Sequence, residues 1–239
     1  MKAILCGANG AMGKLIDAIL GDKIVGRVSI DGENNVPRTF EELGAVQADM
    51  IIDFSHHSAI ADVLAYAGKH RLAVVTGTTG HTPEEKELIY KAAETLPVFY
   101  SGNMSLGIAV LCRLAKQAAA AFPDADIEIV EMHHNRKVDA PSGTAHMLFN
   151  AIRQVRPMAV EACGRAGEGK RKKDEIGIAS LRLGNVVGVH EVHICTPSQT
   201  LVLRHEAGSR QMLAEGAVDA AVFMEGKQPG LYTMEELLG

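Results

Sequence analysis

The chain has 239 residues, of which 47% are hydrophobic and 22% are charged, with only 8 prolines. This composition is typical of a globular protein and excludes a disordered or fibrous chain. The formal net charge of −5 at pH 7 excludes a general attraction to nucleic acid or to an anionic membrane, so an anionic ligand must be held by a local basic site.

Strand and helix patterns alternate over the first hundred residues. The apolar runs predict strands, and apolar residues at helical spacing predict helices between them. Thr82, Pro83 and Glu85 form a capping box at the start of one helix. Strands separated by helices predict an α/β fold with a Rossmann-like, doubly wound parallel sheet. The expected strands are 2–6, 24–30, 50–54, 72–75 and 97–100, and the expected helices are 11–20, 58–70 and one from residue 82.

The pattern changes after residue 105. Three adjacent strand patterns joined by short turns predict a second, α+β domain whose mixed or antiparallel sheet is exposed on one side, a common oligomerisation surface. A last helix at 211–223 and the tail are expected to return to the first domain. The expected elements between them are helices at 105–121 and 142–155 and strands at 126–132, 176–183, 187–195 and 200–204.

Two domains follow from this order of elements. We expect a discontinuous first domain at 1–105 and 211–239, and a second domain at 106–210. The glycine-rich, charged segment 164–174 is typical of a mobile surface loop.

The expected location is the cytoplasm. The amino terminus lacks the apolar stretch and cleavage site of a signal peptide, and no segment approaches the roughly 18 apolar residues of a membrane span. The four cysteines stand singly, without a CxxC pair, as in a reduced protein. We therefore expect no nucleic-acid or membrane partner.

A glycine turn between the first strand and the first helix predicts a dinucleotide site. Gly7 permits a tight turn, Gly10 lets the backbone approach a pyrophosphate, and Gly13 allows close helix–sheet packing. Free N–H groups at the helix start favour phosphate. The GxxGxxG spacing is less common than GxGxxG, and its position after the first strand strengthens the prediction. The turn consists of Gly7, Ala8, Asn9, Gly10, Ala11, Met12 and Gly13.

The choice between NADH and NADPH stays open at the tip of the second strand. An acidic residue there binds the ribose hydroxyls, and a basic residue favours the 2′-phosphate. The tip, 27–32, holds neither in an unambiguous place. Asp31 is a candidate for the ribose and equally a turn residue.

Two further loops follow the fourth and fifth strands, at the edge where ligands of open α/β sheets bind. Their small and hydroxyl-bearing residues favour a nicotinamide-ribose site. They are Gly77, Thr78 and Thr79, and Ser101, Gly102, Asn103 and Met104.

The segment 131–145 carries the catalytic signal. Two histidines and two cations follow a strand within five positions, and Ser142 is placed to cap a helix. The N–H groups of Gly143 and Thr144, with the Thr144 hydroxyl, would form a carboxylate-sized anion site, and Ser142 at this helix start is a further candidate for substrate binding. Lys137 would add a positive charge, and His133 or His134 a proton. Together they predict a dianionic substrate that receives a hydride and a proton.

A metal site is the weaker reading of the histidines. His133 with His134, or His190 with His193, could suggest zinc. On a strand, however, residues three apart face opposite sides, so His190 and His193 cannot chelate one ion together. We expect no metal.

Several motifs resemble the 4-hydroxy-tetrahydrodipicolinate reductase (dihydrodipicolinate reductase) family and occur in the same order. They extend over nearly the whole chain: GANGAMG at 7–13, GTTG at 77–80, SGNMSLG at 101–107, EMHHNRKVDAPSGTA at 131–145, DEIGIASLRLGNVVGVHE at 174–191 and FMEGKQPGLYTMEELL at 223–238.

This resemblance implies a homotetramer that reduces a cyclic dicarboxylate with NADH or NADPH and releases water. It implies a discontinuous dinucleotide-binding domain at 1–105 and 211–239, with a substrate-binding and oligomerisation domain at 106–210 between its parts. It implies that His133 is the acid/base residue, that Lys137 donates a proton, and that His134, Gly143 and Thr144 bind substrate carboxylates. The nucleotide would contact the glycine turn and the loops at 77–79 and 101–104. The second-strand tip departs from the many family members with an acidic residue there.

Two other functions remain open on sequence alone. One is another Rossmann oxidoreductase, such as a sugar or aspartate dehydrogenase, that shares only the cofactor half. The other is a non-catalytic module that binds a dinucleotide, although such a module needs no acid/base group.

Overall fold

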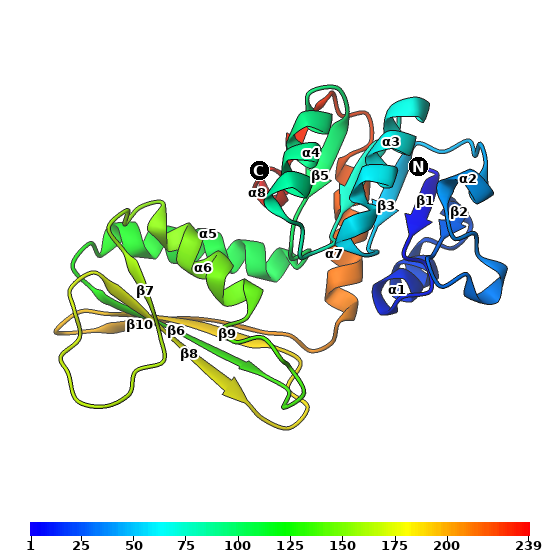
Figure 1. Cartoon of the computed structure of the whole chain (residues 1–239). Coiled ribbons are helices and arrows are strands. Elements are labelled where there is room, and N and C mark those ends of the chain that lie inside the picture. Colours follow the sequence, from blue (N-terminus) through cyan, green and yellow to red (C-terminus); the bar gives the residue numbers. More distant parts are fainter. The chain divides into compact units, whose positions relative to one another are not determined.

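The chain passes between two folding units twice, after Ser105 and after Arg210. The computed structural model describes every residue from Met1 to Gly239 (Figure 1). Unit 1 comprises Met1–Ser105 and Gln211–Gly239, and unit 2 comprises Leu106–Arg210. None of the helices combines the length and apolar character needed to cross a membrane.

Unit 1 is built on a sheet of six parallel strands in the order β11-β5-β4-β3-β1-β2. All four residues of β3 are buried, as expected for a strand covered on both faces. The strands are β1 (Ala3–Cys6), β2 (Ile24–Val28), β3 (Met50–Asp53), β4 (Ala73–Thr76), β5 (Pro97–Tyr100) and β11 (Gly230–Tyr232).

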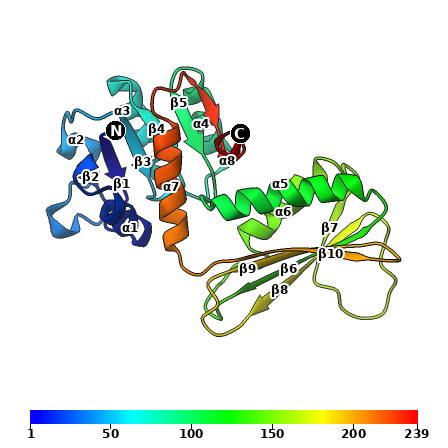
Figure 2. The ribbon, with the colours of Figure 1, turned by 180° about the vertical axis from the view of Figure 1, so that it is seen from behind.

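Helices cover both faces of this sheet. The pair α1 (Ala11–Leu20) and α7 (Gln211–Phe223) lies on one face, and the pair α3 (Ile60–His70) and α4 (Pro83–Ala93) on the other (Figures 1 and 2). The capping box predicted at Thr82 is confirmed: its side chain accepts from the Glu85 N–H, and the Glu85 side chain accepts in return. Short helices α2 (Phe40–Leu43) and α8 (Met234–Leu238), and 3₁₀ turns at 21–23, 33–35 and 57–59, complete the unit.

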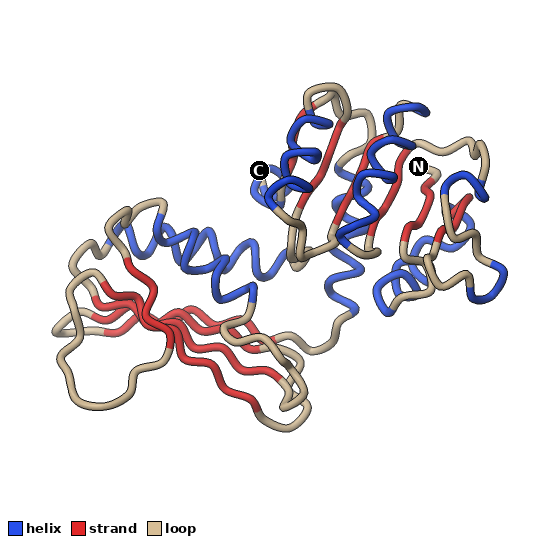
Figure 3. Tube along the Cα trace, viewed as in Figure 1, coloured by secondary structure: helices blue, strands red, loops and turns tan.

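Unit 2 is a mixed sheet with two helices on one face. The order is β10-β9-β6-β8-β7. Strands β6, β8 and β7 pair in parallel, and β9 is antiparallel to both of its neighbours, β6 and β10. Apolar residues of α5 (Leu106–Ala121) and α6 (Gly143–Arg153) form a core with the sheet, and the opposite face carries no helix (Figure 3). The strands are β6 (Asp126–His133), β7 (Val160–Cys163), β8 (Glu175–Arg182), β9 (Val189–Cys195) and β10 (Thr200–Glu206).

Three details differ from the sequence predictions. The second strand ends at Val28, not Ile30, because the Ser29 N–H turns away to the carbonyl of Pro37. The strands at 175–182 and 189–195 follow one another in the chain but do not pair, because β6 lies between them. The short strands β7 and β11 were not predicted, since four and three residues give too little periodicity to detect.

Candidate active site

The glycine turn lies where the order of the unit 1 sheet reverses. From β1 the sheet continues to β2 on one side and to β3 on the other, and ligands of open parallel sheets bind at such a point. Two of the predicted glycines are sterically required. A Cβ on Gly7 would lie 2.3 Å from the Phe54 carbonyl oxygen, and one on Gly13 would lie 2.2 Å from that of Gly7. No side chain caps α1, so the N–H groups of its first turn are available to an anion.

A cavity of about 1230 Å³ opens beside this turn. Its lining includes Gly7 and Gly10 from the turn and Asp31 and Arg38 from the segment after β2. Asn9 donates to Asp31 over 2.6 Å, and this bond, with the Glu33 N–H, holds the pKa of Asp31 below its usual value. The cavity therefore presents a carboxylate and a guanidinium near one another, a pair suited to ribose hydroxyls and phosphate.

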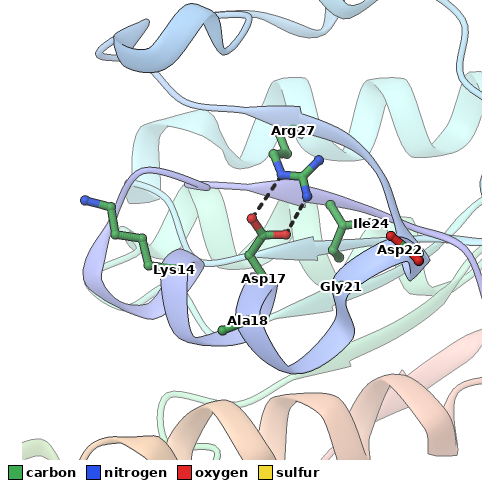
Figure 4. A pocket seen from close by; sticks show the side chains of 7 residues that line it. All are labelled: Lys14, Asp17, Ala18, Gly21, Asp22, Ile24 and Arg27. Carbon is green, nitrogen blue, oxygen red and sulfur yellow. Dashed lines mark hydrogen bonds and ion pairs between the residues drawn. The ribbon is translucent and has the colours of Figure 1, made fainter.

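Arg27, the basic residue of the predicted strand tip, is directed elsewhere. Its guanidinium donates to both carboxylate oxygens of Asp17 on α1, over 3.1 and 2.6 Å (Figure 4). Both residues line a separate depression of about 570 Å³ together with Lys14 and Asp22. Arg38, which lies outside the window considered in the sequence, is thus the cation beside Asp31.

The loops after β3 and β4 are tied together by a buried acidic side chain, Asp53. It accepts hydrogen bonds from the hydroxyls of Thr76 and Thr78 over 2.8 and 2.9 Å and from Ser55 over 2.5 Å. The predicted loops 77–79 and 101–104 are adjacent, since a Cβ on Gly102 would lie 3.8 Å from the Thr79 methyl group. Sequence reasoning missed Asp53 because it lies inside an apolar run.

The predicted helix cap in unit 2 is confirmed. Ser142 precedes α6, and its hydroxyl accepts from the Ala145 N–H over 3.2 Å. The same hydroxyl is 3.1 Å from Nε2 of His190, and Ser142 is only 2% exposed. Ser142 therefore holds the helix start from inside, and its side chain does not face an open site as a substrate-binding role would require. A Cβ on Gly143 would meet nothing within 4 Å, so this position is open to a ligand.

Glu131 is a fully buried carboxylate beneath this helix start. Arg182 donates to both of its oxygens, over 3.0 and 2.7 Å, and the Ser142 N–H donates over 3.3 Å. Burial alone would raise the pKa of Glu131, but hydrogen bonds from Arg182, Ser180 and His133 outweigh it and lower the pKa below its usual value. Glu131 is therefore an anion at neutral pH.

His133 lies between Glu131 and His190. Its Nδ1 is hydrogen-bonded to Glu131, and its ring meets the His190 ring edge-to-face at 5.2 Å. Burial, followed by the neighbouring His133, lowers the pKa of His190 to about 4, so His190 is neutral near pH 7.

Positive charge gathers around His134. Burial lowers the pKa of His134, and Arg136, Arg210 and Lys137 lower it further. Lys137 also bonds Asp139 over 2.7 Å. Arg210 is far from this segment in the chain, and no local signal in the sequence marks it. The result is a cationic site around His134, which favours a carboxylate.

Glu131, His133 and His190 are close enough for metal ligation, with candidate ligand atoms within 4.8 Å of one another. Both oxygens of Glu131 are already bonded to the Arg182 guanidinium, so a metal ion would have to displace a cation that the protein itself supplies. His193, in contrast, pairs with Glu191 on the other face of β9.

Comparison with known families covers almost the whole chain. Residues 1–104 match the family described as "Dihydrodipicolinate reductase, N-terminus", and residues 107–238 match "Dihydrodipicolinate reductase, C-terminus". The chain is 42% identical to 4-hydroxy-tetrahydrodipicolinate reductase of Caldanaerobacter subterraneus subsp. tengcongensis, with 100% of this chain and 98% of the relative covered. It is 40% identical to the enzyme of the same name from Alkaliphilus oremlandii, with the same coverage.

Solved structures agree with these relatives. A dipicolinate-bound dihydrodipicolinate reductase from Paenisporosarcina sp. TG-14 aligns with a TM-score of 0.81 at 25% identity, covering 99% of this chain and 98% of that one. An aspartate dehydrogenase from Thermotoga maritima aligns with a TM-score of 0.52 at 13% identity, covering 95% and 97%. The second likeness extends to the fold alone.

The low pKa of His190 predicts a pH-dependent contribution to stability. In an unfolded chain histidine titrates near 6.5, so between about pH 6.5 and 4 the unfolded state binds the additional proton. The free energy of unfolding therefore falls as the pH falls through this window. We predict that the free energy of unfolding falls by about 3 kcal/mol less in His190→Gln than in the wild type between pH 7 and 4. Urea unfolding over this pH range measures the difference.

His56→Gln, on an exposed turn of unit 1, is the matched control and should follow the wild-type curve. A His190→Gln curve parallel to that of the wild type would contradict the prediction.

Proposed function

The chain belongs to the dihydrodipicolinate reductase family, and we propose specific residues for each part of its reaction. It reduces 4-hydroxy-tetrahydrodipicolinate to tetrahydrodipicolinate with NADH or NADPH, releasing water, in lysine and diaminopimelate biosynthesis. The observation that carries the assignment of residues is the cationic site around His134, next to His133 in the chain, together with the open position at Gly143. Such a site suits a substrate with two carboxylates.

The nucleotide is proposed to bind at the carboxyl edge of the unit 1 sheet. Three features support this: an uncapped α1, a turn that only glycine can occupy at Gly7, and the adjoining cavity. The residues assigned are the glycine turn 7–13, the loops 77–79 and 101–104, and Asp31 with Arg38. When bound, the reduced nicotinamide supplies the hydride.

His133 and Lys137 are proposed to supply the proton. An imidazole exchanges protons near neutral pH, and the bond from Nδ1 to Glu131 leaves Nε2 for that exchange. Lys137 is half-buried, and its ammonium group is a second donor in the same segment.

His134, Gly143 and Thr144 are proposed to bind the substrate carboxylates. The N-terminus of α6 presents N–H groups and a positive dipole end, and Arg136, Lys137 and Arg210 add positive charge around His134. Ser142 caps α6 by accepting a hydrogen bond from the Ala145 N–H, and so stabilises the helix start that carries Gly143 and Thr144.

We also propose that four copies of the chain assemble through the helix-free face of the unit 2 sheet. Apolar residues lie exposed there, among them Leu181, Val202 and Val160. A charged cluster of Glu191, Arg204 and Glu206 lies on the same face and would fix the register between copies.

The enzyme is proposed to work in the cytoplasm. All four cysteines are free thiols, a state that the cytoplasm maintains.

The role of Lys137 is tested by Lys137→Ala. Loss of a positioned proton donor should lower kcat about 100-fold or more, because general acid catalysis contributes on that scale. The Kd for NADPH, followed by fluorescence, should stay near the wild-type value, because the nucleotide residues lie in unit 1.

Lys173→Ala, in the charged segment 164–174, is the matched control. Wild-type turnover by Lys137→Ala would exclude the proposed role.

The role of Arg38 is tested by the ratio of KM values for NADPH and NADH. Arg38→Ala should raise KM for NADPH about tenfold or more by removing a charge-assisted bond to the 2′-phosphate, and should change KM for NADH little. Arg27→Ala removes a cation directed at Asp17 and should leave the ratio unchanged. An unchanged ratio in Arg38→Ala would show that Arg38 does not contact the 2′-phosphate.

A further inference from the structure

Glu131 is a charged side chain that has no part in the substrate binding or the proton transfer proposed above. It has no exposed surface, although ionised carboxylates are almost never fully buried unless they are paired. It lies two residues before His133 on β6, so the two side chains leave the strand on the same face.

Arg182, on β8, keeps this carboxylate charged. The guanidinium forms two bonds to Glu131 and also donates to the carbonyls of Leu181 and Asp139, so it is fixed from several sides. A bidentate pair of this kind restricts the carboxylate in position and in plane.

An ionised carboxylate can only accept hydrogen bonds. The bond between Glu131 and Nδ1 of His133 therefore requires the hydrogen on Nδ1, and Nε2 is the nitrogen that exchanges a proton. The other oxygen of Glu131 accepts the Ser142 N–H. One carboxylate thus contacts both the acid/base residue and the cap of the helix that is assigned to the substrate carboxylates.

We propose that Glu131 is the positioning residue of the site: it selects the Nδ1–H tautomer of His133, stabilises the protonated ring, and aligns that ring with the start of α6. This inference rests on the proposed role of His133. Glu131 does not touch the substrate and acts through His133 and Ser142.

The other titratable and charged groups around His133 do not stabilise its protonated ring. Arg182, on β8, already donates two hydrogen bonds to Glu131. His190, on β9, is neutral near pH 7, and burial lowers the pKa of His205 on β10. Lys137 and Asp139, in the loop after β6, pair with each other. Glu131 is therefore the anion that a protonated His133 faces.

The pH profile of kcat distinguishes positioning from a purely structural role. If His133 must be protonated, kcat falls as the pH rises. Glu131→Gln keeps the shape but removes the charge that stabilises the protonated ring, so this fall should move to lower pH by about 1 to 2 units. We expect kcat at its optimum to fall about 10-fold or more, with the Kd for NADPH unchanged.

Glu94→Gln, the same change at the exposed end of α4 in unit 1, is the matched control and should keep the wild-type profile. His133→Asn is measured in parallel. If His133→Asn retains the wild-type profile, the proposed role of His133 itself fails. If His133→Asn loses the limb while Glu131→Gln leaves it in place, the role of Glu131 is excluded.

A second measurement does not depend on the folding of a buried variant. Wild-type enzyme with ¹⁵N-labelled histidine should show neutral His133 as the Nδ1–H tautomer, its signal assigned by its disappearance in His133→Asn. An Nε2–H tautomer would overturn the proposal even if Glu131→Gln does not fold.

Discussion

The ion pair between Glu131, which has no exposed surface, and Arg182, which is 19% exposed, organises the end of unit 2 where the catalytic residues are proposed to lie. Removing one partner of a buried pair leaves an uncompensated charge and costs about 3–5 kcal/mol. Here the same carboxylate also bonds His133 and the Ser142 N–H, so the pairing of β6 with β8 builds part of the site as it forms the sheet. His190 completes the arrangement by contacting both the His133 ring and the Ser142 hydroxyl.

Unit 1 uses a buried carboxylate in a comparable way. Asp53 ends β3 and accepts from the hydroxyls of Thr76 and Thr78, so it fixes the loop after β4 against the loop after β3. The loop 77–79, which is proposed to bind the cofactor, is thus held by interior hydrogen bonds. Its backbone lies at the edge of the sheet where ligands of open parallel sheets bind. Each unit in this way uses an acidic side chain in its interior to position the residues proposed to bind ligands.

Local features were predictable from the sequence, and pairings between distant segments were not. Thr82 and Ser142 carry their capping signal within a few residues, and Gly7 and Gly13 are set by sterics inside one turn. Arg27 illustrates the limit: the strand tip left the choice of nucleotide open in the sequence, and the structure shows that Asp17 on α1 binds Arg27 while Arg38 lines the cavity.

The same limit applies to β8 and β9, which the sequence suggested were neighbours and which β6 separates. Glu131, Arg182 and Arg210 acquire their roles only through contacts across strands or across more than 50 residues of chain, so neither periodicity nor spacing reveals them. The family motifs identified the reaction, and the structure supplied the partners that organise it.

The central claim, a reductase whose unit 2 binds a planar dicarboxylate, is tested most directly by calorimetric titration of pyridine-2,6-dicarboxylate into the enzyme saturated with NADPH or NADH. We predict saturable binding that weakens about tenfold or more in Thr144→Val and His134→Ala, because each removes a proposed donor to a carboxylate. Absence of binding with both nucleotides, or undiminished binding in both variants, would contradict it.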